Sequence, residues 1–234
     1  DLHSFPTRRS SDLPTEGSCG RILIVAGSRG MTGAAALCSE AVLRAGAGIA
    51  VLAVAAGLQG ILAAKLTEVM TRPLPESAAG VLGDKALEPL KKMAADYDAV
   101  LLGPGLGRAS ETGELVRRFV KEVQKPCVLD ADALVAFAGH TEELALLPDP
   151  VILTPHLGEM AALSGLEILA LRENLIPVCR KAAADWQAVL VVKSECTIVA
   201  LPDGRVFLTS TGNAGMATAG TGDVLAGKIG RAHV

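Results

Sequence analysis

The chain has 234 residues, half of them apolar and 3% aromatic, and carries a formal net charge of −3 at neutral pH. This length fits one large domain, and the acidic balance argues against a nucleic-acid surface, which would show a basic stripe. No apolar run is long enough to span a membrane. The five cysteines are scattered without CxxC spacing, so we expect a reducing cytoplasm and no disulfide or zinc framework.

Apolar runs alternate with helical stretches along the chain, which predicts βαβ units around a mainly parallel sheet. Ser110 is the expected N-cap of its helix, Pro177 the expected interruption of the longest helix, and residues 202–204 (Pro-Asp-Gly) the expected hairpin turn. The expected strands are residues 21–27, 49–55, 98–103, 126–130, 151–154, 188–193, 197–201 and 205–209, and the expected helices are 34–46, 84–95, 110–122 and 166–185.

Glycines and acids follow several expected strands, at the edge where open α/β sheets bind ligands. Glycine-rich loops follow the first strand and the strand ending at residue 103, Asp130 and Asp132 follow the run at 127–129, and His156 and Glu159 follow 151–154. The first loop lacks the G-x-G-x-x-G spacing, which argues against a Rossmann dinucleotide site. Outside the two ends of the chain, His140 and His156 are too few for a histidine-based metal site.

The run GNAGMATAGTGDVLAG, at residues 212–227, is the most informative segment of the chain. Gly220, Thr221 and Gly222 allow a tight turn before a helix whose free N–H groups and positive dipole end would face an anion. Asp223 beside such an anion site suits removal of a proton from a hydroxyl while a phosphoryl group arrives. The alternative interpretation is a glycine-rich turn with Asp223 as the helix N-cap.

Several motifs occur in the order found in the ADP- or ATP-dependent NAD(P)H-hydrate dehydratases, which the chain resembles over residues 20–227. The resemblance implies a three-layer ribokinase-like fold, an α/β architecture with a mainly parallel central sheet flanked by helices. The motifs are ILIVAGSRGMTGAAAL (22–37), EVMTRPLPE (68–76), GPGLGR (103–108), VLDADAL (128–134), ILTPHLGEM (152–160) and the run at 212–227.

The resemblance also implies roles for individual residues. Asp223 would be the catalytic base and would contact the substrate. Glu159 would hold Mg²⁺ through water, because Mg²⁺ keeps much of its hydration shell. The other implied residues are Ala35, Gly105 and His156 for the substrate, and Lys193, Ser194, Glu195, Cys196, Thr197, Gly220, Thr221 and Gly222 for the adenine nucleotide.

Two of these positions have another interpretation, and one stretch departs from the family pattern. His156 alone suggests a surface or helix-capping residue, and Glu159 a solvated first-turn residue favoured by the helix dipole. In KSECT (193–197), three residues replace the usual Gly-Ala-Gly. Ser194 matters if its position needs a positive φ, and Glu195 adds an acid near the phosphates, so nucleotide affinity or preference is open.

The implied reaction is the repair of (6S)-hydrated NADH and NADPH. ADP or ATP, with Mg²⁺, would phosphorylate the ring hydroxyl, and loss of phosphate would restore NADH or NADPH; bacterial relatives favour ADP. The implied location is the cytoplasm, and the implied assembly of the parent protein is a homotetramer. Two alternatives stay open: a kinase for a sugar or a vitamin alcohol, because fold does not determine function, and an inactive nucleotide-binding fragment.

Both ends of the chain are predicted to be foreign to the domain. Residues 1–13 (DLHSFPTRRSSDL) and 228–234 (KIGRAHV) resemble translated DNA-sequencing adapters, which leaves 14–227 as the dehydratase-like domain, incomplete at its C-terminus. The helix after Asp223 would then end after about two turns, and an isolated helix this short is marginal. We also expect exposed apolar sheet surface, and whether an epimerase domain precedes residue 17 in the parent stays open.

Overall fold

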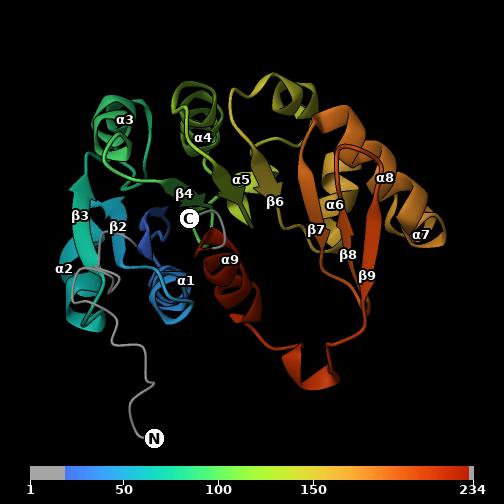
Figure 1. Ribbon diagram of the computed structural model, residues 1–234. Helices are drawn as coiled ribbons and strands as arrows, with labels where there is room; N and C mark the ends of the chain where they lie inside the picture. Colours follow the sequence, from blue (N-terminus) through green and yellow to red (C-terminus); the bar gives the residue numbers. More distant parts are fainter. Residues whose placement is uncertain (1–18, 232–234) are drawn as a thin grey trace, which may run out of the picture.

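A nine-stranded sheet runs through the middle of the molecule in the computed structural model, which describes residues 19–231 (Figure 1). The strands lie in the order β3-β2-β1-β4-β5-β6-β7-β8-β9. Neighbours from β3 to β7 are parallel, whereas β7, β8 and β9 are antiparallel. The strands are β1 Arg21–Val25, β2 Ile49–Ala55, β3 Met70–Leu74, β4 Ala99–Leu102, β5 Cys127–Leu129, β6 Val151–Leu153, β7 Val189–Val192, β8 Thr197–Ala200 and β9 Val206–Thr209.

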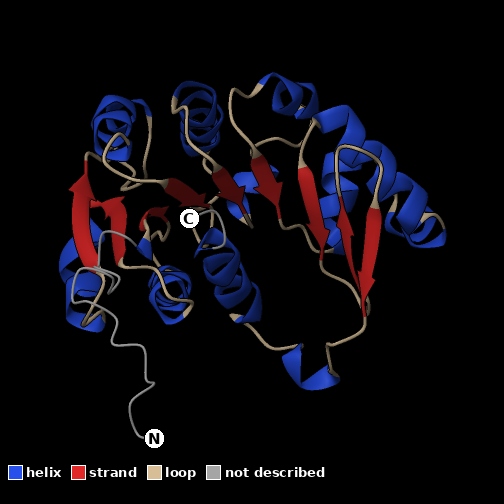
Figure 2. Cartoon of the chain, in the orientation of Figure 1, coloured by secondary structure: helices blue, strands red, loops and turns tan. Residues whose placement is uncertain are grey.

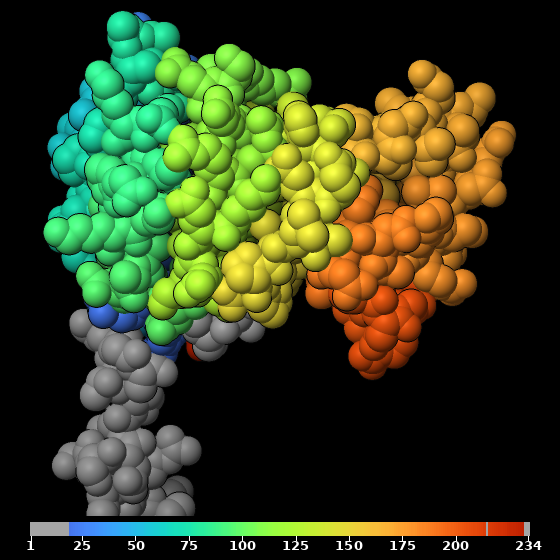
Figure 3. Space-filling view, turned by 90° about the horizontal axis from the view of Figure 1, so that it is seen from above, coloured from blue at the N-terminus to red at the C-terminus, as the bar shows by residue number. Residues whose placement is uncertain are grey.

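Helices cover both faces of the sheet, which confirms the three-layer α/β architecture (Figure 2). Helices α1, α2 and α9 lie on one face, and α3, α4 and α8 lie on the other. Seen from above, the second face shows segments that follow one another in chain order from α3 to α8 (Figure 3). The helices are α1 Thr32–Arg44, α2 Ala56–Lys65, α3 Leu87–Ala94, α4 Ser110–Glu122, α5 Asp132–Val135, α6 Leu157–Ser164, α7 Ile168–Glu173, α8 Leu175–Trp186 and α9 Thr221–Arg231, with short 3₁₀ helices η3 Asp84–Ala86, η4 Thr141–Leu146 and η5 Ala214–Met216.

The central strands form the core of the molecule. Every residue of β4 is buried, as is every residue of β2 after Ile49 and of β1 after Arg21. Parallel strands with helices on both faces have no solvent-facing side, so they contain continuous aliphatic runs instead of alternating ones. This is why these strands were predictable from sequence.

All the predicted strands are present, with ends that shift by at most two residues. Strand β3, helix α2 and several short helices, among them α5 and η4, were not among the expected elements. Strand β3 lies at the sheet edge and is half polar, with Arg72 and Pro73 among its five residues. Helix α2 begins directly after β2, at Ala56, so no loop signal separates the two.

Three local predictions need correction. Helix α4 begins at Ser110, and its N-cap is Ala109, which makes no side-chain capping hydrogen bond. The break between α7 and α8 lies at Asn174, whereas Pro177 sits in the first turn of α8, where its missing N–H leaves no helical bond unmade. Asp223 is not an N-cap, because α9 begins two residues earlier at Thr221.

The ends of the chain are described only in part. Residues 1–13 and 232–234 lie outside the described residues, whereas residues 228–231 form the last turn of α9, with Gly230 buried. On the edge strand β9, Phe207 and Leu208 are more than half exposed. Among residues 19–231, none of the helices is both long and apolar enough to cross a membrane.

Candidate functional site

The loops after β1 and β4 are joined at the carboxyl edge of the sheet. The N–H of Gly27 donates to the carbonyl of Pro104 at 2.9 Å, and the N–H of Gly103 donates to the carbonyl of Val25 at 3.1 Å. The adjacent parallel strands β1 and β4 bring the two loops to the same place. The structure therefore brings together the two glycine-rich loops of the sequence.

Gly105 and Ala35 support this pair of loops from within. Gly105 has a φ of +65°, and a β-carbon there would lie 2.9 Å from Cβ of Met31 and 3.1 Å from Cβ of Ala34. Ala35 is fully buried, with its methyl group beneath Gly27. Both close contacts are therefore with the protein, and contact with a substrate stays a prediction for both residues.

A strained turn after β5 points two acids in different directions. Ala131 has φ +50° and ψ −119°, a conformation that side chains disfavour and that is found mostly at functional sites. Asp132 accepts hydrogen bonds from the N–H of Gly107 at 2.8 Å and from Nε of Arg108 at 3.2 Å. On the other side of the turn, Asp130 is 1% exposed and points into the protein.

Asp130 joins β5 to the two strands that follow in the sheet. The same carboxylate oxygen accepts hydrogen bonds from the hydroxyl of Thr154, at 2.6 Å, and from Nζ of Lys193, at 2.7 Å. Asp130 and Asp132 were recognised in the sequence as acids at the strand edge, but no role was predicted for either, and Thr154 was missed. The signal for Asp130 was its place after a buried strand; its pairing with Lys193 spans 63 residues, and no local pattern shows it.

His156 and Glu159 form a capping box at the start of α6. The N–H of Glu159 donates to Nδ1 of His156 at 3.1 Å, and the carboxylate of Glu159 accepts from the N–H of His156 at 2.8 Å. The helix-capping interpretation of His156 is confirmed, and its side chain is still 58% exposed at the edge of the site. Glu159 is in the first turn but is buried, so the expectation of a solvated residue is wrong, and burial raises the pKa of its carboxyl.

Asp223 lies half-buried in the first turn of α9. Burial raises the pKa of its carboxyl, the Asp130 carboxylate raises it further, and the Lys193 ammonium partly opposes both. The preceding Gly220 has a φ of +89°, and a β-carbon there would lie 2.6 Å from Cδ1 of Leu37. The sharp turn into α9 therefore favours glycine, and it sets a carboxyl with a raised pKa in the first turn of the helix, as a general base next to an anion site requires.

The loop between β7 and β8 contributes Lys193 to this edge. The backbone N–H of Lys193 donates to the carbonyl of Pro155 at 2.8 Å, and a β-carbon on Gly222 would lie 3.4 Å from its Nζ. Ser194 is not among the described residues with a positive φ, so serine fits this position without strain. Thr197 begins β8 and pairs with Thr209, and Ser194, Glu195 and Cys196 line a cavity of about 700 Å³ beside α7 and α8.

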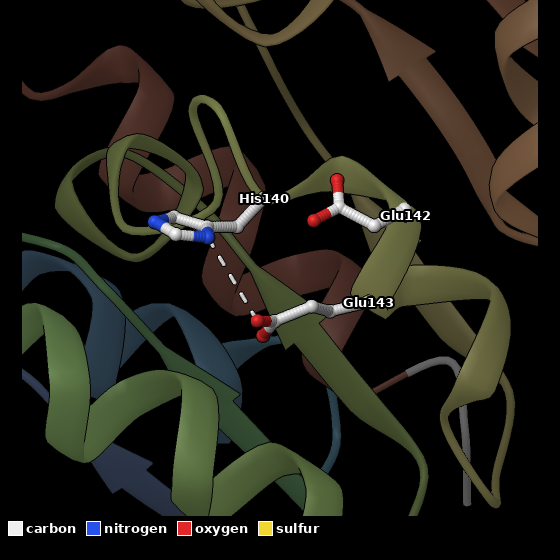
Figure 4. Close-up of side chains that lie close together, drawn as sticks. All are labelled: His140, Glu142 and Glu143. Atoms are coloured by element: carbon white, nitrogen blue, oxygen red, sulfur yellow. Dashed lines mark ion pairs between the residues drawn. The ribbon is translucent and has the colours of Figure 1, made fainter.

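A cluster of possible metal ligands lies at the start of η4, and its His140 lines a small pocket together with Gly107, Arg108 and Asp132. His140, Glu142 and Glu143 bring one ligand atom each to within 4.8 Å of one another (Figure 4). Glu143, however, is paired with Lys121 at 2.9 Å and lies 3.9 Å from Arg117, and these charges lower the pKa of its carboxyl. The carboxylate is already neutralised by cationic side chains, so we interpret this cluster as a group of surface ion pairs.

The fold and this edge define a class, the ribokinase-like enzymes. The structure is similar to that of an ADP/ATP-dependent NAD(P)H-hydrate dehydratase from Bacillus subtilis co-crystallized with ATP/Mg²⁺, with a TM-score of 0.77, 31% identity, and coverage of 98% of this chain and 76% of that one. It is also similar to a ribokinase-like superfamily protein from Enterococcus faecalis, with a TM-score of 0.77, 28% identity, and coverage of 96% and 74%. The NAD(P)H-hydrate dehydratase family profile matches residues 22–232, so the chain belongs to this family.

Curated relatives agree with this assignment. The bifunctional NAD(P)H-hydrate repair enzyme Nnr of Moorella thermoacetica is 49% identical over 96% of this chain and 42% of its own length. The ADP-dependent (S)-NAD(P)H-hydrate dehydratase of Xanthomonas campestris is 38% identical over 94% of this chain and 76% of its own length. The chain thus spans about two fifths of the length of the bifunctional relatives that it matches.

Proposed function

We propose that this domain dehydrates hydrated NADH and NADPH at the expense of ADP or ATP, with release of phosphate. The observation that carries the proposal is the first turn of α9, where the Asp223 carboxyl with its raised pKa lies beside the Gly220–Gly222 turn and the Lys193 ammonium. Family membership supports it, as do the relatives named for this activity. The B. subtilis dehydratase co-crystallized with ATP/Mg²⁺ supports the choice of nucleotide.

In the proposed reaction, Asp223 accepts the proton of the ring hydroxyl as the hydroxyl oxygen attacks the terminal phosphoryl group. The N–H groups of the first turn of α9 stabilise the charge on that group, and they cost no reorganisation because the helix already orients them. Loss of phosphate from the ring then restores the reduced nicotinamide. The loops around Gly105 and the exposed His156 face the same edge and would hold the substrate.

The residues present fit a divalent cation at this edge. Glu159 supplies carboxylate oxygens, the donors that Mg²⁺ prefers, and Mg²⁺ keeps several waters when it binds. Glu159 uses one oxygen on the backbone of His156, so a contact through water suits it better than direct ligation. When bound, Mg²⁺ would neutralise charge between the phosphates.

The test is the return of reduced-nicotinamide absorbance from hydrated NADH, with Mg²⁺ and either ADP or ATP. Activity that requires the nucleotide supports the proposal, and Asp223→Asn should abolish turnover while nucleotide binding is retained. Asp185→Asn, on the exposed end of α8, is the matched control and should leave turnover unchanged. Turnover retained in Asp223→Asn would refute the role of this residue as the base.

Two other outcomes separate the alternatives. The fold is shared with B. subtilis pyridoxal kinase, at 17% identity and a TM-score of 0.57, a likeness that concerns the fold alone. Phosphorylation of a vitamin alcohol or a sugar, without action on hydrated NADH, would identify a kinase. Nucleotide binding without turnover on any of these substrates would identify an inactive fragment.

Location and assembly complete the proposal. All five cysteines are free thiols, which supports a reducing compartment such as the cytoplasm. A homotetramer is implied by the family resemblance, and light scattering at several protein concentrations would measure it. A monomer at all concentrations would rule out the tetramer for this chain.

A further inference from the structure

Lys193 holds its ammonium where the local electrostatics disfavour a cation. Its Nζ would lie 3.4 Å from a β-carbon on Gly222, in the first turn of α9. A helix N-terminus carries a partial positive charge, so it repels an ammonium and attracts an anion. A neighbouring group must therefore hold the ammonium at this position when no anion is bound.

The Asp130 carboxylate holds the ammonium, and a hydrogen bond and close packing fix the position of Asp130 itself. Its side chain is 2% exposed, and its Oδ1 lies 2.7 Å from Nζ of Lys193. The Thr154 hydroxyl donates to the same oxygen at 2.6 Å. A β-carbon on Gly103 would overlap the carbonyl oxygen of Asp130, so the backbone of this turn is packed as closely as its side chain.

We propose that Asp130 is a positioning residue: it holds the Lys193 ammonium against the start of α9, where the ammonium contacts the terminal phosphoryl group of the bound nucleotide. The inference rests on the proposed function, because it takes α9 as the site of phosphoryl transfer. An anion between the ammonium and the helix N–H groups satisfies both sets of donors at once. Asp130 itself touches no ligand and acts only through Lys193.

The first test is a double-mutant cycle on turnover with Asp130→Asn, Lys193→Met and the double variant. Loss of one preorganised donor to a transition-state oxyanion lowers kcat on the order of 100-fold. We expect a loss of that size in Lys193→Met and a smaller loss in Asp130→Asn. Because Asp130 acts through Lys193, the double variant should be no slower than Lys193→Met alone. Losses that multiply would overturn the proposal.

The second test uses binding and needs no turnover. Calorimetry would compare the affinities for ADP and AMP, because only ADP carries the terminal phosphoryl group that the ammonium is proposed to contact. Asp130→Asn and Lys193→Met should both weaken ADP binding about tenfold while changing AMP binding less than about twofold, as expected for loss of one charge-assisted contact. Equal weakening of ADP and AMP binding would show a structural role only and would overturn the proposal.

One further variant probes the contact without disturbing the buried carboxylate. Gly222→Ala places a methyl group that meets Nζ of Lys193 at 3.4 Å, the one contact within 4 Å among the described residues once the adjoining residues and the backbone of α9 itself are set aside. Gly222 is not among the glycines with a positive φ. The Gly222→Ala variant should lower the ADP-to-AMP affinity ratio even if Asp130→Asn fails to fold, and an unchanged ratio would refute the proposed contact. Gly60→Ala, with open space around its site, controls for adding a methyl group to a helix.

An ion-pair control completes the design. Glu122→Gln removes the carboxylate that binds Lys91 at 2.6 Å on the surface, at the last residue of α4. It should change neither turnover nor the affinity ratio. If the unaltered chain shows no dehydratase activity while the ADP-specific losses appear, the proposed function fails and the inference about Asp130 stands.

Discussion

Gly227 is predicted to determine where Asp223 lies. In the middle of α9, a β-carbon on Gly227 would overlap the carbonyl oxygen of Cys38 and lie 2.7 Å from Cβ of Ala41, both on α1. Neither atom can move by a side-chain rotation, so Gly227→Ala must push the two helices apart. Restoring an ordinary carbon–carbon contact requires a shift of roughly 1 Å.

That shift should reach the site, because Asp223 lies one helical turn from Gly227 on the same helix. A displacement of about 1 Å at reacting groups costs on the order of 100-fold in rate, so we expect kcat to fall by about that factor. Overpacking costs about 1–3 kcal/mol, and the better helix propensity of alanine returns up to about 1 kcal/mol. Stability should therefore fall by no more than about 3 kcal/mol, and the variant should remain folded.

Gly230→Ala is the matched control, one turn further along α9. A β-carbon there meets its nearest neighbour, Cβ of Leu101, at 3.7 Å, which is an ordinary contact. Turnover of hydrated NADH and urea unfolding should be measured for both variants side by side. The control should keep its activity within about twofold, because its contact requires no shift. Gly227→Ala with unchanged kcat would refute the argument that helix packing positions the carboxylate.

Three further predictions concern pH, backbone strain and surface. The pKa of the Asp223 carboxyl is raised in the folded state, so this group stabilises the fold at pH values below the ordinary aspartate pKa and loses that contribution as pH rises through the folded pKa. Asp223→Asn should therefore raise the melting temperature at pH 7 and not at pH 3. An unchanged melting temperature at pH 7 would contradict this prediction. Gly103→Ala would put a side chain at a φ of +127° and against the carbonyl oxygen of Asp130, so it should lower the free energy of unfolding in urea by more than about 3 kcal/mol or abolish folding. A decrease below about 1 kcal/mol would show that the turn can relax. Phe207 is 52% exposed on the edge strand β9. Phe207→Thr should lower the binding of a hydrophobic dye while changing the free energy of unfolding by less than about 0.5 kcal/mol. Unchanged dye binding would show that the dye binds to another apolar surface.

The sequence predicted the strands well, because burial on both faces leaves an unmistakable aliphatic run. The run IAVLAVA became β2 without any change of its ends. Strand β3 was missed for the opposite reason: an edge strand faces water, so Arg72 and Pro73 are tolerated there, and Pro73 is a residue that argues against a central strand. Loop residues at the strand ends were predictable in place, because parallel strands bring their carboxyl ends to one edge.

The partners of those residues were not predictable, because they depend on contacts between distant segments. His156 and Glu159 are three residues apart, and their spacing is that of a capping box, which sequence could have indicated. Asp130 and Lys193 have no such local signature, and the backbone conformation of Ala131, which turns Asp130 inward, is one that alanine rarely adopts. Gly103 makes this turn possible, because the absence of a side chain at Gly103 leaves room for the carbonyl oxygen of Asp130.

The arrangement explains why the site tolerates strain at Ala131. Two acids separated by one residue must reach opposite sides of the strand edge: Asp132 holds the N–H of Gly107 in the loop after β4, and Asp130 holds the ammonium beside α9. A relaxed extended backbone would also place alternate side chains on one face, so both acids would point the same way. The conformation at Ala131 separates them, and it thereby ties the loop proposed to hold the substrate and the turn proposed to hold the phosphates to one fixed element after β5.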